Sequence, residues 1–317
     1  MSSLTLYYAS DIHGSEALWR KFLNAGPFYK AEVLIMGGDV TGKGIVPIVE
    51  QVDGTHKATF MGRRRTTNNQ EQLDALEEDI RFNGMYPFRC RPEEIAAAAS
   101  DPALQDALFD QLMERTFGRW LEIGDEKLAK SKLPCYVMPG NDDNWVIDRA
   151  FGPNHRILNC DQQVIDLGQG YTMLSLGYAN RTPWDSPREL DEKDLESRID
   201  ALAAQIPDMS KAIFNLHVPP YKSDLDVAPL LDAQLRPQFD AGHAVMVPVG
   251  STAVRAALER YQPMLGLHGH IHEAKGSKKI GRTVCLNPGS SYNTGRIDGA
   301  LVYLEDDQVK RFQFVSG

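Results

Sequence analysis

Five short polar segments carry the residue types that bind metal ions, and each follows an apolar run. They are residues 10–14 (SDIHG), 37–39 (GGD), 140–143 (GNDD), 215–217 (NLH) and 269–272 (GHIH). A mixed set of carboxylate, amide and imidazole ligands suits first-row divalent metals. A carboxylate can bridge two such ions, and a pair of ions can activate water against a phosphate ester. The segments therefore predict a two-metal centre for phosphate-ester hydrolysis.

Each segment alone is weak evidence for such a centre. Asp-x-His occurs by chance in many soluble proteins, and Gly-Gly-Asp or Gly-Asn-Asp more often forms a turn than a metal ligand. Gly-His-Ile-His is rarer, and by itself leaves both metal binding and a structural role open. Because all five segments occur in one chain, each at the end of an apolar run, coincidence is a poor explanation.

The elements around the first two segments place them together. Residues 4–9 form an apolar run, residues 15–23 have a helical pattern, and residues 32–36 form a second buried strand. This order predicts a βαβ unit, whose polar residues gather at the carboxyl edge of the sheet. We therefore expect Asp11, His13 and Asp39 to lie close together.

Further buried strands deliver the remaining segments. Residues 134–138 lead to Asn141, residues 211–216 lead to His217, and residues 264–267 lead to His270 and His272. We also expect strands at 163–167 and 171–176, a charged helix at 191–205, and strand character in the tail at 282–286, 300–304 and 309–315.

Residues 44–133 interrupt this alternation. An Asp-Gly turn at 53–54 between two apolar runs predicts a β-hairpin over residues 45–60. Apolar residues at helical spacing follow around residues 73–80 and again from residue 102. We interpret the chain as a single domain, 1–317, with an inserted hairpin and mostly helical cap at 44–133. The insertion is a candidate lid, substrate-selecting cap or homo-oligomer surface.

Composition limits the classes of partner. The chain has 317 residues, 42% hydrophobic content and a net charge of −9, which disfavours a protein that grips long nucleic acid. It contains no apolar stretch of about 18 residues and no signal-peptide pattern, so we expect a cytoplasmic protein that does not bind membranes. The four scattered cysteines are expected to be buried thiols.

The ordered segments resemble the signature of the calcineurin-like metallophosphoesterase superfamily: Asp-x-His, Gly-Asp, Gly-Asn-His/Asp, His and Gly-His-x-His. The resemblance covers residues 1–43 and about 134–317, and its details are similar to a prokaryotic Icc-like branch. It implies an α/β fold of two mixed β-sheets packed face to face with flanking helices, an αββα sandwich.

The resemblance also implies a ligand set and two divalent ions, which could be Mn, Fe, Zn or a mixture. By this resemblance Asp11, His13 and His272 bind one ion, Asn141, His217 and His270 bind the other, and Asp39 bridges them.

One position departs from the family pattern. Many members have histidine after the metal-binding asparagine, where it assists the leaving group; this chain has Asp142. An aspartate is ionised at neutral pH and is a poor proton donor. This favours esters with good leaving groups. Family members that lack the histidine resemble phosphodiesterases more than protein phosphatases, so the resemblance implies a phosphodiesterase. Asn141 and Asp142 are the candidate catalytic residues, although Asp142 and Asp143 could instead cap a helix starting near Asn144.

For other polar residues the sequence gives weaker evidence of a functional role. His268 could orient a ligand through a hydrogen bond or be purely structural. Arg181 and Trp184 could bind phosphate and stack on a base, although a structural Trp is the simpler interpretation. Residues 63–65 (RRR) form a basic run, most simply a solvated turn. His56, His155 and His243 are not expected to bind metal.

The sequence thus predicts a dimetal phosphodiesterase that acts on a small or cyclic nucleotide-like diester through a metal-activated water. The alternatives are a phosphomonoesterase and a non-catalytic binding or scaffold protein of the same fold. A nuclease acting on long DNA or RNA is disfavoured by the acidic charge.

Overall fold

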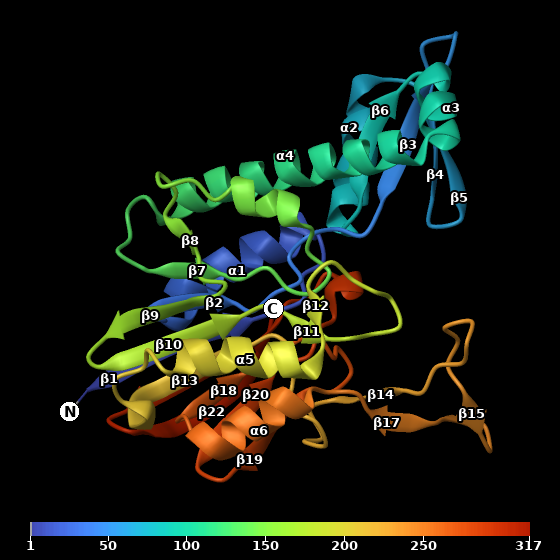
Figure 1. The fold of residues 1–317 in the computed structure, drawn as a ribbon. Coiled ribbons are helices and arrows are strands. Elements are labelled where there is room, and N and C mark those ends of the chain that lie inside the picture. Colours follow the sequence, from blue (N-terminus) through green and yellow to red (C-terminus); the bar gives the residue numbers. More distant parts are fainter. Residues whose placement is uncertain (1) are drawn as a thin grey trace.

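The computed structural model describes residues 2–317 and contains two six-stranded sheets (Figure 1). The first sheet has, in spatial order, β22 (Gln308–Ser316), β21 (Asp298–Glu305), β1 (Ser3–Ala9), β2 (Val33–Met36), β7 (Cys135–Val137) and β8 (Ile157–Asn159). Strands β1, β2, β7 and β8 are parallel, whereas β21 pairs antiparallel with both β1 and β22. The sheet is therefore mixed, as predicted.

The second sheet is also mixed. Its spatial order is β19 (Gly276–Ile280), β20 (Thr283–Asn287), β18 (Leu265–Leu267), β13 (Ala212–Leu216), β10 (Tyr171–Leu176) and β9 (Gln163–Gly168). The four central strands are parallel, and the edge strands β9 and β19 are antiparallel to their neighbours.

The two sheets pack face to face. Apolar side chains of the first sheet, such as Leu6 and Ile35, form one buried cluster with side chains of the second, such as Met173, Ile213 and Leu267. Period-two alternation on each strand sends the other apolar side chains to the outer faces, where helices cover them. The predicted αββα sandwich is confirmed.

Helices α1 (Glu16–Tyr29) and α4 (Pro102–Leu128) cover the first sheet, and α5 (Glu192–Ala203) and α6 (Thr252–Tyr261) cover the second. The indole rings of Trp19 and Trp120 stack with centroids 5.6 Å apart, joining α1 to α4. Helix α4 ends the insertion, so the inserted segment also supplies part of the main core.

The insertion forms a small sheet in the order β5 (Arg63–Thr67), β4 (His56–Phe60), β3 (Ile45–Glu50) and β6 (Tyr86–Cys90), with helices α2 (Gln70–Phe82) and α3 (Pro92–Ser100). The predicted hairpin is confirmed as β3–β4. The basic run 63–65 lies in strand β5 and not in a turn, because it pairs antiparallel with β4. Strand β6 and helix α3 were not predicted.

A second projection was also missed by the sequence analysis. Short strands β14 (Val227–Pro229), β15 (Phe239–Asp240), β16 (His243–Ala244) and β17 (Met246–Pro248) form an arm, which extends at the lower right of Figure 1. The remaining elements are the parallel pair β11 (Ala179–Asn180) and β12 (Glu189–Leu190), and the 3-10 turns η1 (Trp145–Arg149), η2 (Met209–Lys211) and η3 (Tyr292–Thr294).

Within residues 2–317, none of the helices combines the length and apolar character that a membrane crossing requires.

Candidate metal centre

The candidate ligands occupy loops at the carboxyl ends of parallel strands in both sheets. Asp11 and His13 follow β1, Asp39 follows β2, and Asn141 follows β7. From the second sheet, His217 directly follows β13, while His270 and His272 follow β18. Because the sheets pack with these edges on the same side, loops far apart in sequence converge on one site.

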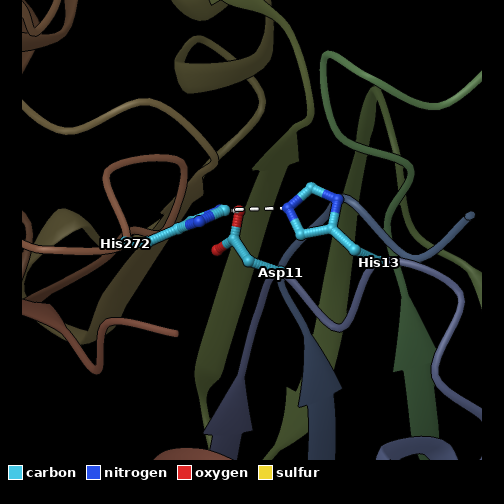
Figure 2. A group of neighbouring side chains, drawn as sticks. All are labelled: Asp11, His13 and His272. Carbon is cyan, nitrogen blue, oxygen red and sulfur yellow. Dashed lines mark hydrogen bonds and ion pairs between the residues drawn. The ribbon is translucent and has the colours of Figure 1, made fainter. Parts of the chain in front are cut away.

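One group consists of Asp11, His13 and His272, whose ligand atoms all lie within 4.8 Å of one another. Figure 2 shows the edges of the two imidazole rings pointing toward each other beside the Asp11 carboxylate. Their Nε2 atoms are 3.0 Å apart. The His272 Nε2 atom lies 3.4 Å from Asp11 Oδ1. This is the first of the two ligand sets that the resemblance implied.

A second group consists of Asp39, His217 and His270, again within 4.8 Å. His217 Nε2 lies 3.4 Å from Asp39 Oδ1 and 3.1 Å from the Asn141 side-chain oxygen. The other ring nitrogen of His217, Nδ1, is 2.8 Å from the Gly37 carbonyl and donates to it. This bond leaves Nε2 free to act as a ligand.

The backbone is unusual at these positions. Asp11, His13, Asp39 and His270 have positive φ angles of 58°, 40°, 51° and 65°. Residues other than glycine rarely adopt this conformation, and such strain gathers at functional sites. It is maintained by contacts such as the hydrogen bonds from the His270 N–H to both oxygens of Asp11, each 3.1 Å long.

Burial and mutual attraction together set the charges of the group. Burial opposes ionisation of Asp11, but the hydrogen bond with His272 and the nearby histidine charges hold its pKa well below its usual range. Burial raises the pKa of Asp39 to about 6. Burial disfavours a charged His217, yet the Asp39 carboxylate outweighs this and raises its pKa to about 10. His217 thus favours its positively charged form beside the two carboxylates, whereas burial lowers the pKa values of His13 and His270.

These residues fit divalent ions. The Nε2 atoms of His13 and His272 are 3.0 Å apart. This separation is compatible with both nitrogens binding one ion at about 2.1 Å each. Carboxylates with imidazoles form a donor set typical of Mn, Fe and Zn sites. Asp39 lies between the groups, because its carboxylate also comes within 4.8 Å of the ligand atoms of His13 and Asp142.

Asp142 is held beside the centre by two residues that the sequence analysis did not select. Its Oδ2 lies 2.8 Å from Lys43 Nζ, and its Oδ1 accepts a 2.8 Å hydrogen bond from the Ser186 hydroxyl. Burial opposes ionisation of Asp142, but the Lys43 charge and hydrogen bonds lower its pKa to about 2. The expectation that Asp142 is ionised at neutral pH is therefore supported.

Asp143 has a structural role different from the one considered. Its buried carboxylate accepts from the backbone N–H groups of Val40, Thr41 and Gly140, and from the Thr41 hydroxyl. The capping interpretation is wrong for both aspartates, because the Asn144 side chain caps η1 by accepting from the Val146 N–H. Asp143 instead ties the loop that carries Asn141 to the loop that follows Asp39.

His268 and Asn287 lie behind the last histidine pair. The His268 Nδ1 atom is 2.9 Å from the Leu216 carbonyl, next to His217 in sequence, and the ring is fully buried. The Asn287 amide donates to the carbonyls of Gly269 and Ile271, at 3.3 and 2.9 Å. Asn287 thereby shapes the loop that presents His270 and His272; an orienting role for His268 stays a prediction.

Arg181 and Trp184 are in a different setting. The guanidinium of Arg181 pairs with Asp191 at 3.1 Å and with Asp185 at 3.7 Å, while Trp184 is exposed. Their loop reaches the centre through Ser186, as described above. Substrate binding by Arg181 and Trp184 stays a prediction.

The root of the insertion contacts the ligand loops. The Ser15 hydroxyl donates to the Phe82 carbonyl at 3.0 Å, and the Gly42 N–H donates to the Tyr86 hydroxyl at 2.7 Å. Gly84, at φ 75°, packs against the backbone of His13 so closely that a β-carbon would overlap the His13 carbonyl oxygen. The insertion is therefore fixed at its root beside the centre.

Comparison with known proteins shows which structures share this fold. No family model matches the chain. The uncharacterized protein MJ1162 of Methanocaldococcus jannaschii is 29% identical over 197 residues, covering 60% of this chain and 80% of that protein. One crystal structure is 13% identical with a TM-score of 0.56, and covers 99% of both chains. The structure of TT1561 from Thermus thermophilus is 14% identical with a TM-score of 0.52, and also covers 99% of both chains.

Two face-to-face mixed sheets, with the five polar segments at one edge, are the arrangement that the sequence resemblance implied. The chain has an αββα sandwich fold. This fold accounts for the position of each ligand loop, while the similarity to solved structures extends to the fold alone.

Proposed function

We propose that this protein is a dimetal phosphoesterase that hydrolyses a small phosphodiester, with cyclic or other nucleotide-like diesters as the first candidates. The observation that carries the proposal is the convergence of Asp11, His13 and His272 with Asp39, His217 and His270 in two adjacent groups. Strained backbone at four of these residues supports a functional role over a structural one.

Each residue has a defined task in this proposal. When bound, two divalent ions supply an activated water and positive charge for the transition state. The Asp39 carboxylate lies near ligand atoms of both residue groups and keeps the two groups at a fixed distance from each other. His217 is fixed by the Gly37 carbonyl so that its Nε2 faces the Asn141 side chain. Asn141 in turn donates to Asp142 at 3.0 Å, which fixes its amide orientation.

The preference for a diester rests on Asp142. The Lys43 charge and hydrogen bonds keep this carboxylate ionised at neutral pH, so Asp142 is a poor proton donor for a basic leaving group. The competing proposals are a phosphomonoesterase and a binding protein that keeps the site without turnover.

Hydrolysis of bis(p-nitrophenyl) phosphate against p-nitrophenyl phosphate tests the proposal. The protein would be stripped of metal, reloaded with Mn, and compared with Asp39→Asn and with Asp208→Asn, a matched change at an exposed turn. We expect faster diester turnover and a loss of at least about 100-fold in the Asp39 variant alone. Preference for the monoester would overturn the diester assignment. Absence of turnover with both metals bound would favour the binding-protein alternative.

A further inference from the structure

Lys43 places a positive charge beside Asp142. The Nζ atom is 2.8 Å from Asp142 Oδ2, and the two side chains are 46% and 29% exposed. The opposite oxygen of Asp142 accepts from Ser186 and Asn141, at 2.8 and 3.0 Å. Both carboxylate oxygens of Asp142 thus have partners. The carboxylate therefore keeps one orientation, and Lys43 pairs with a group whose position is fixed.

The backbone that carries Lys43 is also fixed. Two residues earlier, the Thr41 N–H donates to Asp143 at 2.8 Å, and one residue earlier, the Gly42 N–H donates to the Tyr86 hydroxyl at 2.7 Å. A half-exposed lysine ordinarily loses much side-chain entropy when it forms an ion pair, so such pairs at a surface contribute little to stability. Its placement here therefore calls for a role other than stabilising the fold.

The position of the pair suggests that role. Asp142 shares a cluster with His13 and Asp39, whose ligand atoms lie within 4.8 Å of its carboxylate. A phosphate group bound at the centre would meet the negative charge of Asp142 at close range. Because Lys43 pairs with the same carboxylate and is partly open to solvent, its ammonium can offset that charge.

We propose that Lys43 is a positioning residue that neutralises Asp142 and thereby admits an anionic phosphate group to the metal centre. This inference rests on the proposed phosphoesterase function and deepens it. In this inference the Lys43–Asp142 pair determines how strongly the site repels a negatively charged substrate. When the lysine is removed, the incoming phosphate meets a carboxylate whose charge is no longer compensated. A dianionic ligand must then lose more affinity than a monoanionic one.

The test compares Lys43→Met with Lys278→Met in Mn-loaded protein. Lys278 is a matched control, since it is 42% exposed and pairs with Asp224 at 2.6 Å on another surface. The first readout is calorimetric binding of inorganic phosphate, which does not depend on turnover. We expect affinity to fall about tenfold in Lys43→Met and to be unchanged in Lys278→Met. Lys43→Arg should retain most of the affinity.

The second readout is the KM for the two nitrophenyl esters. In Lys43→Met we expect KM to rise about tenfold for the monoester and about threefold for the diester, with a smaller change in kcat. The double variant Lys43→Met/Asp142→Asn should recover much of the lost phosphate affinity, because the repelling charge is gone.

The outcomes separate the two proposals. Unchanged phosphate affinity in Lys43→Met would overturn the role of Lys43, whether or not the protein hydrolyses esters. An equal loss for both esters that Asp142→Asn does not relieve would overturn it as well, since a general structural defect would act in that way. Lys43-dependent phosphate binding without hydrolysis would support the inference while contradicting the phosphoesterase proposal.

Discussion

Gly84 of the insertion packs against the carbonyl oxygen of His13, a candidate ligand 71 positions earlier in the chain. The contact leaves no room for a β-carbon, and Gly84 has a φ of 75° that other residues adopt only with strain. The insertion and the first ligand loop are therefore parts of one packed unit.

A Gly84→Ala substitution should destabilise the protein and disturb metal binding. We expect a loss of about 2–4 kcal/mol in the free energy of unfolding, from the overlap together with the backbone conformation. Urea denaturation and Mn titration would measure both effects. Gly62→Ala is the control, because Gly62 has a φ of 72° and, among the described residues, no atom within 4 Å of its added β-carbon. Equal effects in both variants would contradict the role of the contact.

Asp143→Asn should lower stability and metal affinity together. The buried carboxylate accepts four hydrogen bonds, and an amide would direct its own N–H groups at some of those donors. We expect a cost of about 2–4 kcal/mol. Asp53→Asn is the matched control, since Asp53 accepts from Thr55 in an exposed turn. If thermal denaturation gave the same midpoint for both variants, Asp143 would not be the link between the two ligand loops.

Removal of metal should lower stability reversibly. Ions that bind the folded chain stabilise it by about 2.7 kcal/mol when their concentration is 100 times the dissociation constant. We expect chelation to lower the Tm and added Mn to restore it, with little response in Asp39→Asn. The protein must be shown to be metal-free at the start. If its Tm then changed with neither chelator nor Mn, the result would argue against the candidate centre.

Alkaline pH should destabilise the protein through its buried thiols. Burial raises the pKa of Cys160 and Cys285 to about 12 and that of Cys135 further. In the unfolded chain these thiols ionise near pH 8.5, so above that pH the folded state binds more protons than the unfolded state. Stability is therefore complete below about pH 8.5 and declines as pH rises toward 12, by about 1.4 kcal/mol per pH unit for each thiol.

Urea denaturation at pH 7.5, 9 and 10 would measure this decline. The double variant Cys135→Ala/Cys285→Ala should show a smaller slope with pH than the native chain. A slope that does not change in the variant would show that other groups, such as the buried tyrosines, dominate.

The sequence by itself determined the parts of the molecule that depend on local pattern. Although the two face-to-face sheets and the place of His217 in the site were implied only by the family resemblance, strand periodicity and the polar residues after each strand predicted a βαβ unit and the proximity of Asp11, His13 and Asp39. This succeeded because parallel strands of a sheet place their carboxyl ends at one edge, so the order of elements already implies proximity. The hairpin at β3–β4 could also be predicted from the sequence, since an Asp-Gly turn specifies a hairpin locally.

Only the tertiary structure decided the partners of the polar residues near the centre. Lys43 and Ser186 meet on Asp142 from segments that precede and follow it by 99 and 44 positions, and no local spacing marks either as a neighbour. Asp143 resembled a helix cap because its residue type suits one, whereas packing gave it three donors from the loop after Asp39 and one from its own loop. Hydrogen bonds and ion pairs between distant segments depend on atomic positions that a one-dimensional pattern does not contain. The candidate metal ligands could therefore be selected from the sequence, but the charge environment that surrounds them could not.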